Sequence, residues 1–113
     1  HADETGSGAG EGFTLNFPMP PKTGFGEWRK ALSEGMDRIA GFAPDALIIS
    51  LGVDTFENDP ISFFKLTSND YLTLGADIVA AGLPTVFVME GGYDIEEIGV
   101  NTVNTLIGFE KAL

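Results

Sequence analysis

The chain has 113 residues, of which 43% are hydrophobic and 11% aromatic, a length and composition that indicate one small globular domain rather than a disordered or collagen-like chain. Its formal net charge of −11 argues against a nucleic-acid partner, because contact with a phosphate backbone needs clustered cations. The absence of cysteine excludes disulfides, thiolate zinc sites and a cysteine nucleophile, and no apolar run approaches the roughly eighteen residues of a membrane span.

The first part of the chain predicts a loop, a strand and a helix. Residues 1–13 are rich in Gly, Asp and Glu and lack apolar periodicity, so we expect a loop. Residues 13–17 predict a short strand that ends at the prolines of positions 18, 20 and 21. From about Gly26 to Phe42, apolar residues recur at helical spacing and predict an amphipathic helix. These residues are Trp28, Leu32, Met36, Ile39 and Ala40.

Two strands and two helices follow. Residues 46–51 are apolar almost without a break, which is typical of a strand covered on both faces. A helix capped by Ser68 or Asn69 is expected to continue to a stop at Gly82. Residues 84–89 predict another strand, and a last helix, interrupted by Gly99, is expected from about Ile95 to the carboxyl terminus.

This order of elements predicts an α/β fold with a parallel sheet and right-handed crossovers, as in three-layer, doubly wound folds. Three parallel strands are few for such a sheet, and the chain opens in a glycine-rich loop with no strand before it. We therefore expect residues 1–113 to be the carboxyl-terminal part of a single larger α/β domain whose upstream half is absent.

Asp54 and Tyr93 are the main candidates for chemistry. Each follows an apolar strand and comes after glycine, Asp54 in Gly52-Val53-Asp54 and Tyr93 in Glu90-Gly91-Gly92-Tyr93. Parallel strands end at the same sheet edge, where open α/β folds place their sites, so the two residues are expected to lie at one edge.

Each candidate has a plainer interpretation. Asp54 can be a metal ligand, a base or the cap of a turn, and its acidic neighbours Glu57 and Asp59 favour the metal. Tyr93 is either a packed tyrosine with a satisfied hydroxyl or a phenol that donates a hydrogen bond to a developing oxyanion.

The remaining motifs have weaker claims. The glycine run at residues 6–12 suggests a phosphate loop, but a strand follows it instead of a helix, and Glu11 would repel phosphate. Trp28 and Tyr71 fit helix faces and are expected in the core. Phe63 and Phe64 are adjacent, so at most one is expected to point inward, and the other could line a pocket or touch a partner. His1, the only histidine, is given no catalytic role.

Three groups of motifs follow one another along nearly the whole chain. They are Gly10-Glu11-Gly12 with Asn16-Phe17-Pro18-Met19-Pro20, Gly52-Val53-Asp54-Thr55 with Asp59-Pro60, and Met89-Glu90-Gly91-Gly92-Tyr93. Together they resemble the carboxyl-terminal half of the histone deacetylase and acetylpolyamine amidohydrolase superfamily. The Glu-Gly-Gly-Tyr form, followed by Ile98-Gly99 and Asn101, is most similar to the acetylpolyamine amidohydrolase and bacterial deacetylase-like branch.

The resemblance implies an arginase-like α/β fold and a zinc ion held by two aspartates and a histidine. Asp54 stands at the second aspartate, and Tyr93 at the tyrosine that supports the oxyanion while the metal polarises the acetamide carbonyl and activates water. By the same resemblance, Gly91 and Gly92 shape the acyl tunnel and Ile61 forms part of its wall.

The chain also departs from the family pattern. It lacks the Asp-x-His ligand pair and the paired histidines, which lie upstream in the family, and one carboxylate is too few for catalytic zinc. We therefore expect residues 1–113 to be inactive alone, within a parent zinc deacetylase that acts on acetylpolyamines or acetyl-lysine peptides. The acidic balance mildly favours cationic substrates.

Two alternatives stay open. One is a non-catalytic α/β scaffold or assembly fragment, and the other is a nucleotide-binding flavodoxin-like domain, which Asp54 and Glu90 at the strand ends oppose. Unpaired sheet edges would invite self-association, so a homo-oligomer is expected. With neither a basic leader nor an apolar signal core at its amino terminus, the chain is predicted to be cytoplasmic.

Overall fold

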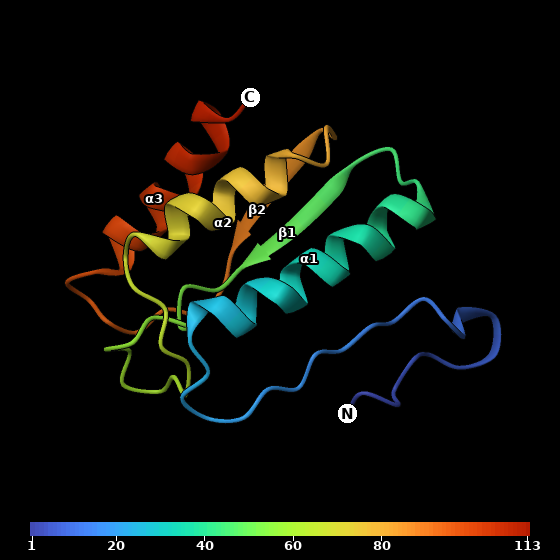
Figure 1. The fold of residues 1–113 in the computed structure, drawn as a ribbon, viewed down its shortest axis with the longest axis horizontal. Coiled ribbons are helices and arrows are strands. Elements are labelled where there is room, and N and C mark those ends of the chain that lie inside the picture. Colours follow the sequence, from blue (N-terminus) through green and yellow to red (C-terminus); the bar gives the residue numbers. More distant parts are fainter.

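Helices and parallel strands alternate along the chain in the computed structural model, which describes residues 1–113 (Figure 1). A single 3-10 turn, η1, covers Gly8–Gly10. The elements that follow are α1 (Phe25–Phe42), β1 (Leu47–Leu51), α2 (Asp70–Val79), β2 (Thr85–Met89) and α3 (Ile98–Lys111). The predicted α/β class with a parallel sheet is therefore confirmed. None of the helices combines the length and the apolar character needed to cross a membrane.

The sheet consists of β1 and β2 alone, paired in parallel. The register runs from Leu47 opposite Thr85 to Leu51 opposite Met89, so the two strands begin and end level. The segments that leave them therefore start side by side at the same edge.

The predicted strand at residues 13–17 is wrong. This segment passes beneath α1 without joining the sheet (Figure 1), and Phe13 packs edge-on against Phe42 of α1 at 5.7 Å between ring centroids. The Arg38 guanidinium donates a hydrogen bond to the Gly12 carbonyl oxygen. A strand needs a neighbour for its backbone donors and acceptors, and no other strand of this chain lies beside residues 13–17.

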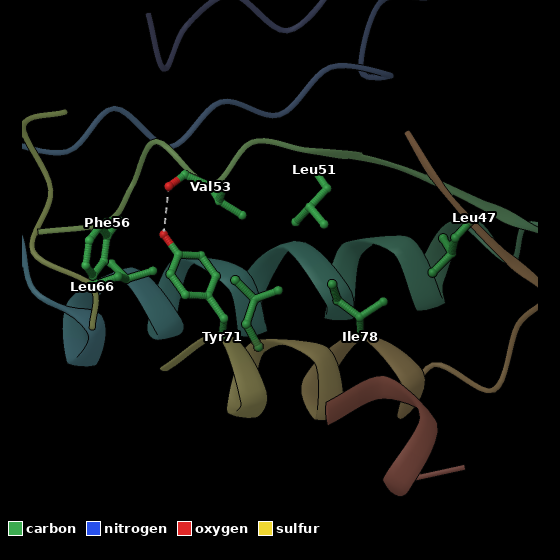
Figure 2. Close-up of a cluster of buried hydrophobic side chains, with 8 residues drawn as sticks. Leu47, Leu51, Val53, Phe56, Leu66, Tyr71 and Ile78 are labelled. Carbon is green, nitrogen blue, oxygen red and sulfur yellow. Dashed lines mark hydrogen bonds between the residues drawn. The ribbon is translucent and has the colours of Figure 1, made fainter. Parts of the chain in front are cut away.

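The core lies between one face of the sheet and the helices. Its buried side chains are Leu47, Leu51, Val53, Phe56, Leu66, Tyr71, Leu74 and Ile78, most of which Figure 2 labels. Four members of the predicted α1 stripe pack against this cluster, namely Trp28, Leu32, Met36 and Ile39, whereas Ala40 is exposed. The predicted burial of Trp28 and Tyr71 is confirmed, with Trp28 partly and Tyr71 fully buried.

The other face of the sheet is open. Ile48 is 76% exposed and Val86 59% exposed, because alternate residues of a strand point to opposite faces. The expectation that residues 46–51 are covered on both faces is therefore wrong for this chain, which contributes helices to one face only.

Two predicted helix ends need correction. Asn69 occupies the N-cap position of α2 but makes no side-chain cap hydrogen bond, because its backbone is already helical, with φ of −71° and ψ of −27°, rather than extended. In the same turn, Asp70 accepts hydrogen bonds from the backbone and hydroxyl of Thr67. The helix ends at Val79, three residues before Gly82, which adopts a left-handed conformation with φ of 67°. In α3, Gly99 lies within the first turn and does not interrupt the helix.

Helices α2 and α3 pack backbone against backbone. A Cβ atom on Gly75 would lie 2.0 Å from the Thr105 carbonyl oxygen, and one on Gly108 would lie 1.9 Å from the Leu72 carbonyl oxygen. Both distances are far below van der Waals contact, so only glycine permits this approach. The pair of helices in turn carries side chains that hold the loops at the sheet edge.

Candidate active site

The segments after β1 and β2 continue the ladder beyond the sheet. The Glu90 amide donates to the Leu51 carbonyl at 2.9 Å, and the Val53 amide donates to the Gly91 carbonyl at 2.7 Å. This pairing confirms that the segments bearing Asp54 and Tyr93 meet at the carboxyl edge of the sheet.

The Asp54 carboxylate lies over the backbone of Gly91. A Cβ atom on Gly91 would stand only 2.3 Å from Asp54 Oδ2, and one on Gly52 would stand 3.0 Å from Asp54 Oδ1. The neighbouring residues Thr55 and Asp59 take part in side-chain hydrogen bonds, but no group of the protein donates one to the Asp54 carboxylate. Both Asp54 oxygens therefore keep lone pairs available for a group from outside the chain.

Asp59 is in the opposite situation, because the backbone occupies its oxygens. It is 6% exposed, and its Oδ1 accepts hydrogen bonds from the amides of Ile61 at 2.9 Å and Ser62 at 3.1 Å. Its Oδ2 accepts from the Tyr93 amide at 2.7 Å. Asp59 is therefore a structural acceptor rather than a second metal ligand, and Glu57 is exposed, so these two residues lend no support to the metal at Asp54.

Sequence reasoning missed this role of Asp59, although a signal was present. An aspartate that begins a turn, here Asp59-Pro60-Ile61-Ser62, commonly accepts hydrogen bonds from amides two and three residues later. The contact with Tyr93 crosses 34 positions of sequence and had no local signal.

Tyr71 of α2 anchors the segment around Asp54 from below (Figure 2). Its hydroxyl donates to the Val53 carbonyl at 3.1 Å and shares a 2.8 Å hydrogen bond with the Thr55 hydroxyl, on either side of Asp54. The side chain is fully buried, and burial raises the pKa of the Tyr71 phenol above its ordinary value of 10.0. This phenol therefore stays protonated and serves as a fixed donor.

Tyr93 is held by its backbone, while its side chain is 49% exposed and its hydroxyl has no hydrogen-bond partner in the chain. The preceding Gly92 is tightly enclosed, since a Cβ atom there would lie 2.7 Å from Val53 Cγ2 and 3.1 Å from Ile98 Cδ1. The two glycines thus let the post-strand segments pack closely, and their tunnel-shaping role stays a prediction.

The loop after Asp59 carries exposed apolar side chains. Ile61 is 59% exposed and Phe63 is 70% exposed, whereas Phe64 packs against the core. This confirms that only one of the adjacent phenylalanines points inward. The assignment of Ile61 to a tunnel wall stays a prediction. Ile61 does not line the hollow of about 710 Å³ in this chain, which lies between residues 12–17 and α1.

The residues of this chain do not fit a complete zinc site. No three His, Cys, Asp or Glu side chains come together in an arrangement that could hold a metal ion. Catalytic zinc sites take three protein ligands, so Asp54 offers one part of such a site at most.

The chain belongs to the histone deacetylase domain family, whose sequence pattern it matches over residues 1–107. It is 56% identical over 112 residues to acetylpolyamine amidohydrolase 1 of Pseudomonas aeruginosa, covering 99% of this chain and 32% of that protein. It is also 56% identical over 108 residues to the acetylpolyamine amidohydrolase of Mycoplana ramosa, covering 96% of this chain and 32% of that protein.

Solved structures agree with this assignment. The crystal structure of an acetylpolyamine aminohydrolase from Burkholderia pseudomallei superposes with a TM-score of 0.95 at 38% identity, over 99% of this chain and 33% of that one. The HDA15 HD domain superposes with a TM-score of 0.90 at 26% identity, again over 99% of this chain and 33% of that one. The chain therefore spans about a third of the length of the relatives that it matches.

Proposed function

We propose that residues 1–113 are part of a zinc-dependent amidohydrolase that removes the acetyl group from N-acetylated amines, with acetylpolyamines preferred over acetyl-lysine. The hydrogen bond between Val53 and Gly91 carries this proposal, because it sets the unbonded Asp54 carboxylate against the glycines that precede Tyr93. Similarity to acetylpolyamine amidohydrolases supports the reaction class.

Two residues of this chain have proposed roles. Asp54 would supply one of three zinc ligands, since its oxygens lie against Gly91 and accept no hydrogen bond from the protein, and a carboxylate is an accepted zinc donor. Tyr93 would donate its phenolic proton in a hydrogen bond to the substrate oxygen as that oxygen gains negative charge. The remaining zinc ligands and the groups that accept the proton of water would come from outside residues 1–113.

The preference for polyamine conjugates rests on charge. Six basic residues stand against seventeen acidic ones, which gives a field that attracts cations. A singly acetylated polyamine keeps at least one ammonium group, whereas the side chain of acetyl-lysine is neutral, so the acetylpolyamine would be favoured.

The test measures zinc content and deacetylation of an acetylpolyamine and an acetyl-lysine peptide, for this chain alone and together with a segment supplying the rest of a family-length domain. We expect zinc and turnover only in the combined sample. Asp54→Asn should abolish both, whereas Tyr93→Phe should keep zinc and lower kcat by about a hundredfold or more.

Asp45→Asn is the matched control, because Asp45 is an exposed carboxylate at the opposite end of β1. It should leave zinc content and turnover unchanged. A correctly folded combined sample without zinc or activity would contradict the proposal.

A non-catalytic scaffold is the second candidate, and it is favoured by the absence of a metal-binding cluster within the chain. It predicts that the combined sample takes up no zinc and binds no deacetylase inhibitor of the metal-chelating class. Zinc uptake that depends on Asp54 would rule it out.

A further inference from the structure

We propose that Asp59 is a positioning residue that fixes the Tyr93 backbone relative to the segment bearing Asp54. This inference rests on the proposed role of Tyr93 in the reaction. The contact itself, between Asp59 Oδ2 and the Tyr93 amide at 2.7 Å, is independent of any role in catalysis.

The Asp59 carboxylate is a two-sided acceptor. One oxygen closes its own turn by accepting from the amides of Ile61 and Ser62, while the other reaches across to Tyr93. Asp59 is only 6% exposed, so water has little access to replace it as an acceptor for these amides. Losing the carboxylate would therefore leave the Tyr93 amide without a hydrogen-bond partner. Only an acceptor on both sides satisfies this arrangement, and a carboxylate provides one oxygen for each side.

The loop that carries Asp59 is itself well fixed. The Asp59 amide donates to the Phe56 carbonyl at 3.1 Å, and Phe56 is a core residue with 4% exposure. On either side of Phe56, the Glu57 amide donates to Leu66 and the Leu66 amide donates to Thr55, at 2.8 and 3.2 Å. Asp59 is therefore held on a braced loop, which suits it to hold another segment.

Two hydrogen bonds then tie the Tyr93 segment to the Asp54 segment. The first joins Val53 to Gly91 near the strand ends, and the second joins Asp59 to Tyr93 two residues further on. A single link would let the chain after Gly91 pivot, whereas two links fix its direction. The Tyr93 phenol has no partner of its own, so its place relative to Asp54 depends on this backbone.

The decisive variant is Asp59→Asn, which keeps the shape and one oxygen. If that oxygen serves Ile61 and Ser62, the amide NH₂ faces the Tyr93 N–H, and two donors oppose each other. We expect hydrogen exchange of the Tyr93 amide, measured by NMR in residues 1–113, to accelerate about tenfold or more. Exchange of the Val53 amide should stay unchanged.

Asp70→Asn is the matched control, because Asp70 also accepts a backbone hydrogen bond, from Thr67, but has no contact with Tyr93. It should leave Tyr93 exchange unchanged. The single oxygen left in Asp59→Asn can serve only one side, either Tyr93 or the pair Ile61 and Ser62. Unaltered exchange at all three of these amides in a folded Asp59→Asn variant would overturn the proposal. If that variant does not fold, a Tyr93 amide that exchanges in the unsubstituted chain as fast as an unbonded amide would overturn it equally.

A second measurement separates positioning from general stability. In the active combined protein, Asp59→Asn should lower kcat about tenfold or more with zinc content and KM unchanged, and it should have no further effect in a Tyr93→Phe background. Additive effects of the two substitutions would overturn the positioning role. Failure of the deacetylase assay itself would count against the proposed function, while the exchange result would still decide the Asp59 contact.

Discussion

Two tyrosines at the carboxyl edge of the sheet have hydroxyls in opposite environments. Tyr71 is fully buried and its hydroxyl bridges Val53 and Thr55, whereas Tyr93 is half-exposed and its hydroxyl is unpaired. The first hydroxyl supports the loop, and the second is free to meet a substrate.

Removing the two hydroxyls should therefore affect stability very differently. We expect Tyr71→Phe to lower the free energy of unfolding by about 1–3 kcal/mol, because it removes two hydrogen bonds, one to the Val53 carbonyl and one with the Thr55 hydroxyl. The Val53 carbonyl then keeps only the longer bond from the Phe56 amide, at 3.4 Å. Tyr93→Phe should change it by less than about 0.5 kcal/mol, since no hydrogen bond is lost. Urea unfolding of both variants checks this, and equal effects would contradict it.

The buried phenol also predicts a pH dependence. Because burial raises the pKa of Tyr71 in the folded state, both states keep the proton below the ordinary value of 10.0, and its contribution is constant there. At higher pH the unfolded chain releases the proton first, so the free energy of unfolding should fall, by up to about 1.4 kcal/mol per pH unit. Unfolding measured between pH 9 and 11 should show this fall reduced in Tyr71→Phe, and identical slopes would contradict the assignment.

The two aspartates near the site show what local sequence leaves open. Asp54 and Asp59 are both acidic residues in one loop, and both were compatible with a metal site. In the structure, the Asp54 carboxylate lies against Gly91 and accepts no hydrogen bond, whereas Asp59 accepts one from the Tyr93 amide. This difference depends on where Gly91 and Tyr93 lie in space, and no local sequence pattern indicates it.

At the scale of elements, the contact between α2 and α3 depends on Gly75 and Gly108. Helical spacing predicted both helices, but each glycine reads in sequence only as a weak point in its helix. The structure shows instead that each gives room for a carbonyl oxygen of the other helix. Backbone atoms cannot rotate away as a side chain would, so the contact tolerates little added volume.

We expect Gly75→Ala to destabilise the chain by about 1–3 kcal/mol, because its Cβ atom would lie 2.0 Å from the Thr105 carbonyl oxygen and force the helices apart. Gly99→Ala is the control, since Gly99 is also helical but has no atom within 4 Å of its added Cβ. It should be neutral or stabilising by up to about 1 kcal/mol. The midpoints of thermal unfolding of the Gly75→Ala and Gly99→Ala variants check this expectation. A Gly75→Ala variant that is more stable than the unsubstituted chain would refute the packing argument.

The helices and the two paired strands were predictable because each has a local signal. The apolar stripe of α1 reflects a helix against a core, and the apolar runs of β1 and β2 reflect strands that pair. Residues 13–17 carry a similar apolar signal, but a strand also requires a neighbour, and in this chain they have none.

At the scale of the whole molecule, the open face and edges of the sheet dominate. Ile48, Val86 and Val88 are exposed on one face, and each strand has an unpaired edge. Apolar surface next to free backbone groups is a template for association. We therefore propose that residues 1–113 self-associate when isolated from the rest of a family-length domain.

Sedimentation at micromolar concentration tests this proposal. We expect an oligomer for the unsubstituted chain and a shift toward monomer for Val86→Lys, which places a charge on the open face. Val103→Lys is the control, because Val103 is 50% exposed on α3, away from the sheet. A monomeric unsubstituted chain would contradict the proposal.

The sequence by itself determined the α/β class, the helices, the paired strands and the edge at which Asp54 and Tyr93 lie, because periodicity and strand order are local properties. The tertiary structure decided the rest. This includes the open sheet face, the close approach of α2 and α3, the Asp54 carboxylate that accepts no hydrogen bond, and the hydrogen bond from the Tyr93 amide to Asp59. These features depend on atoms that are distant in sequence and near in space, so packing alone fixes them.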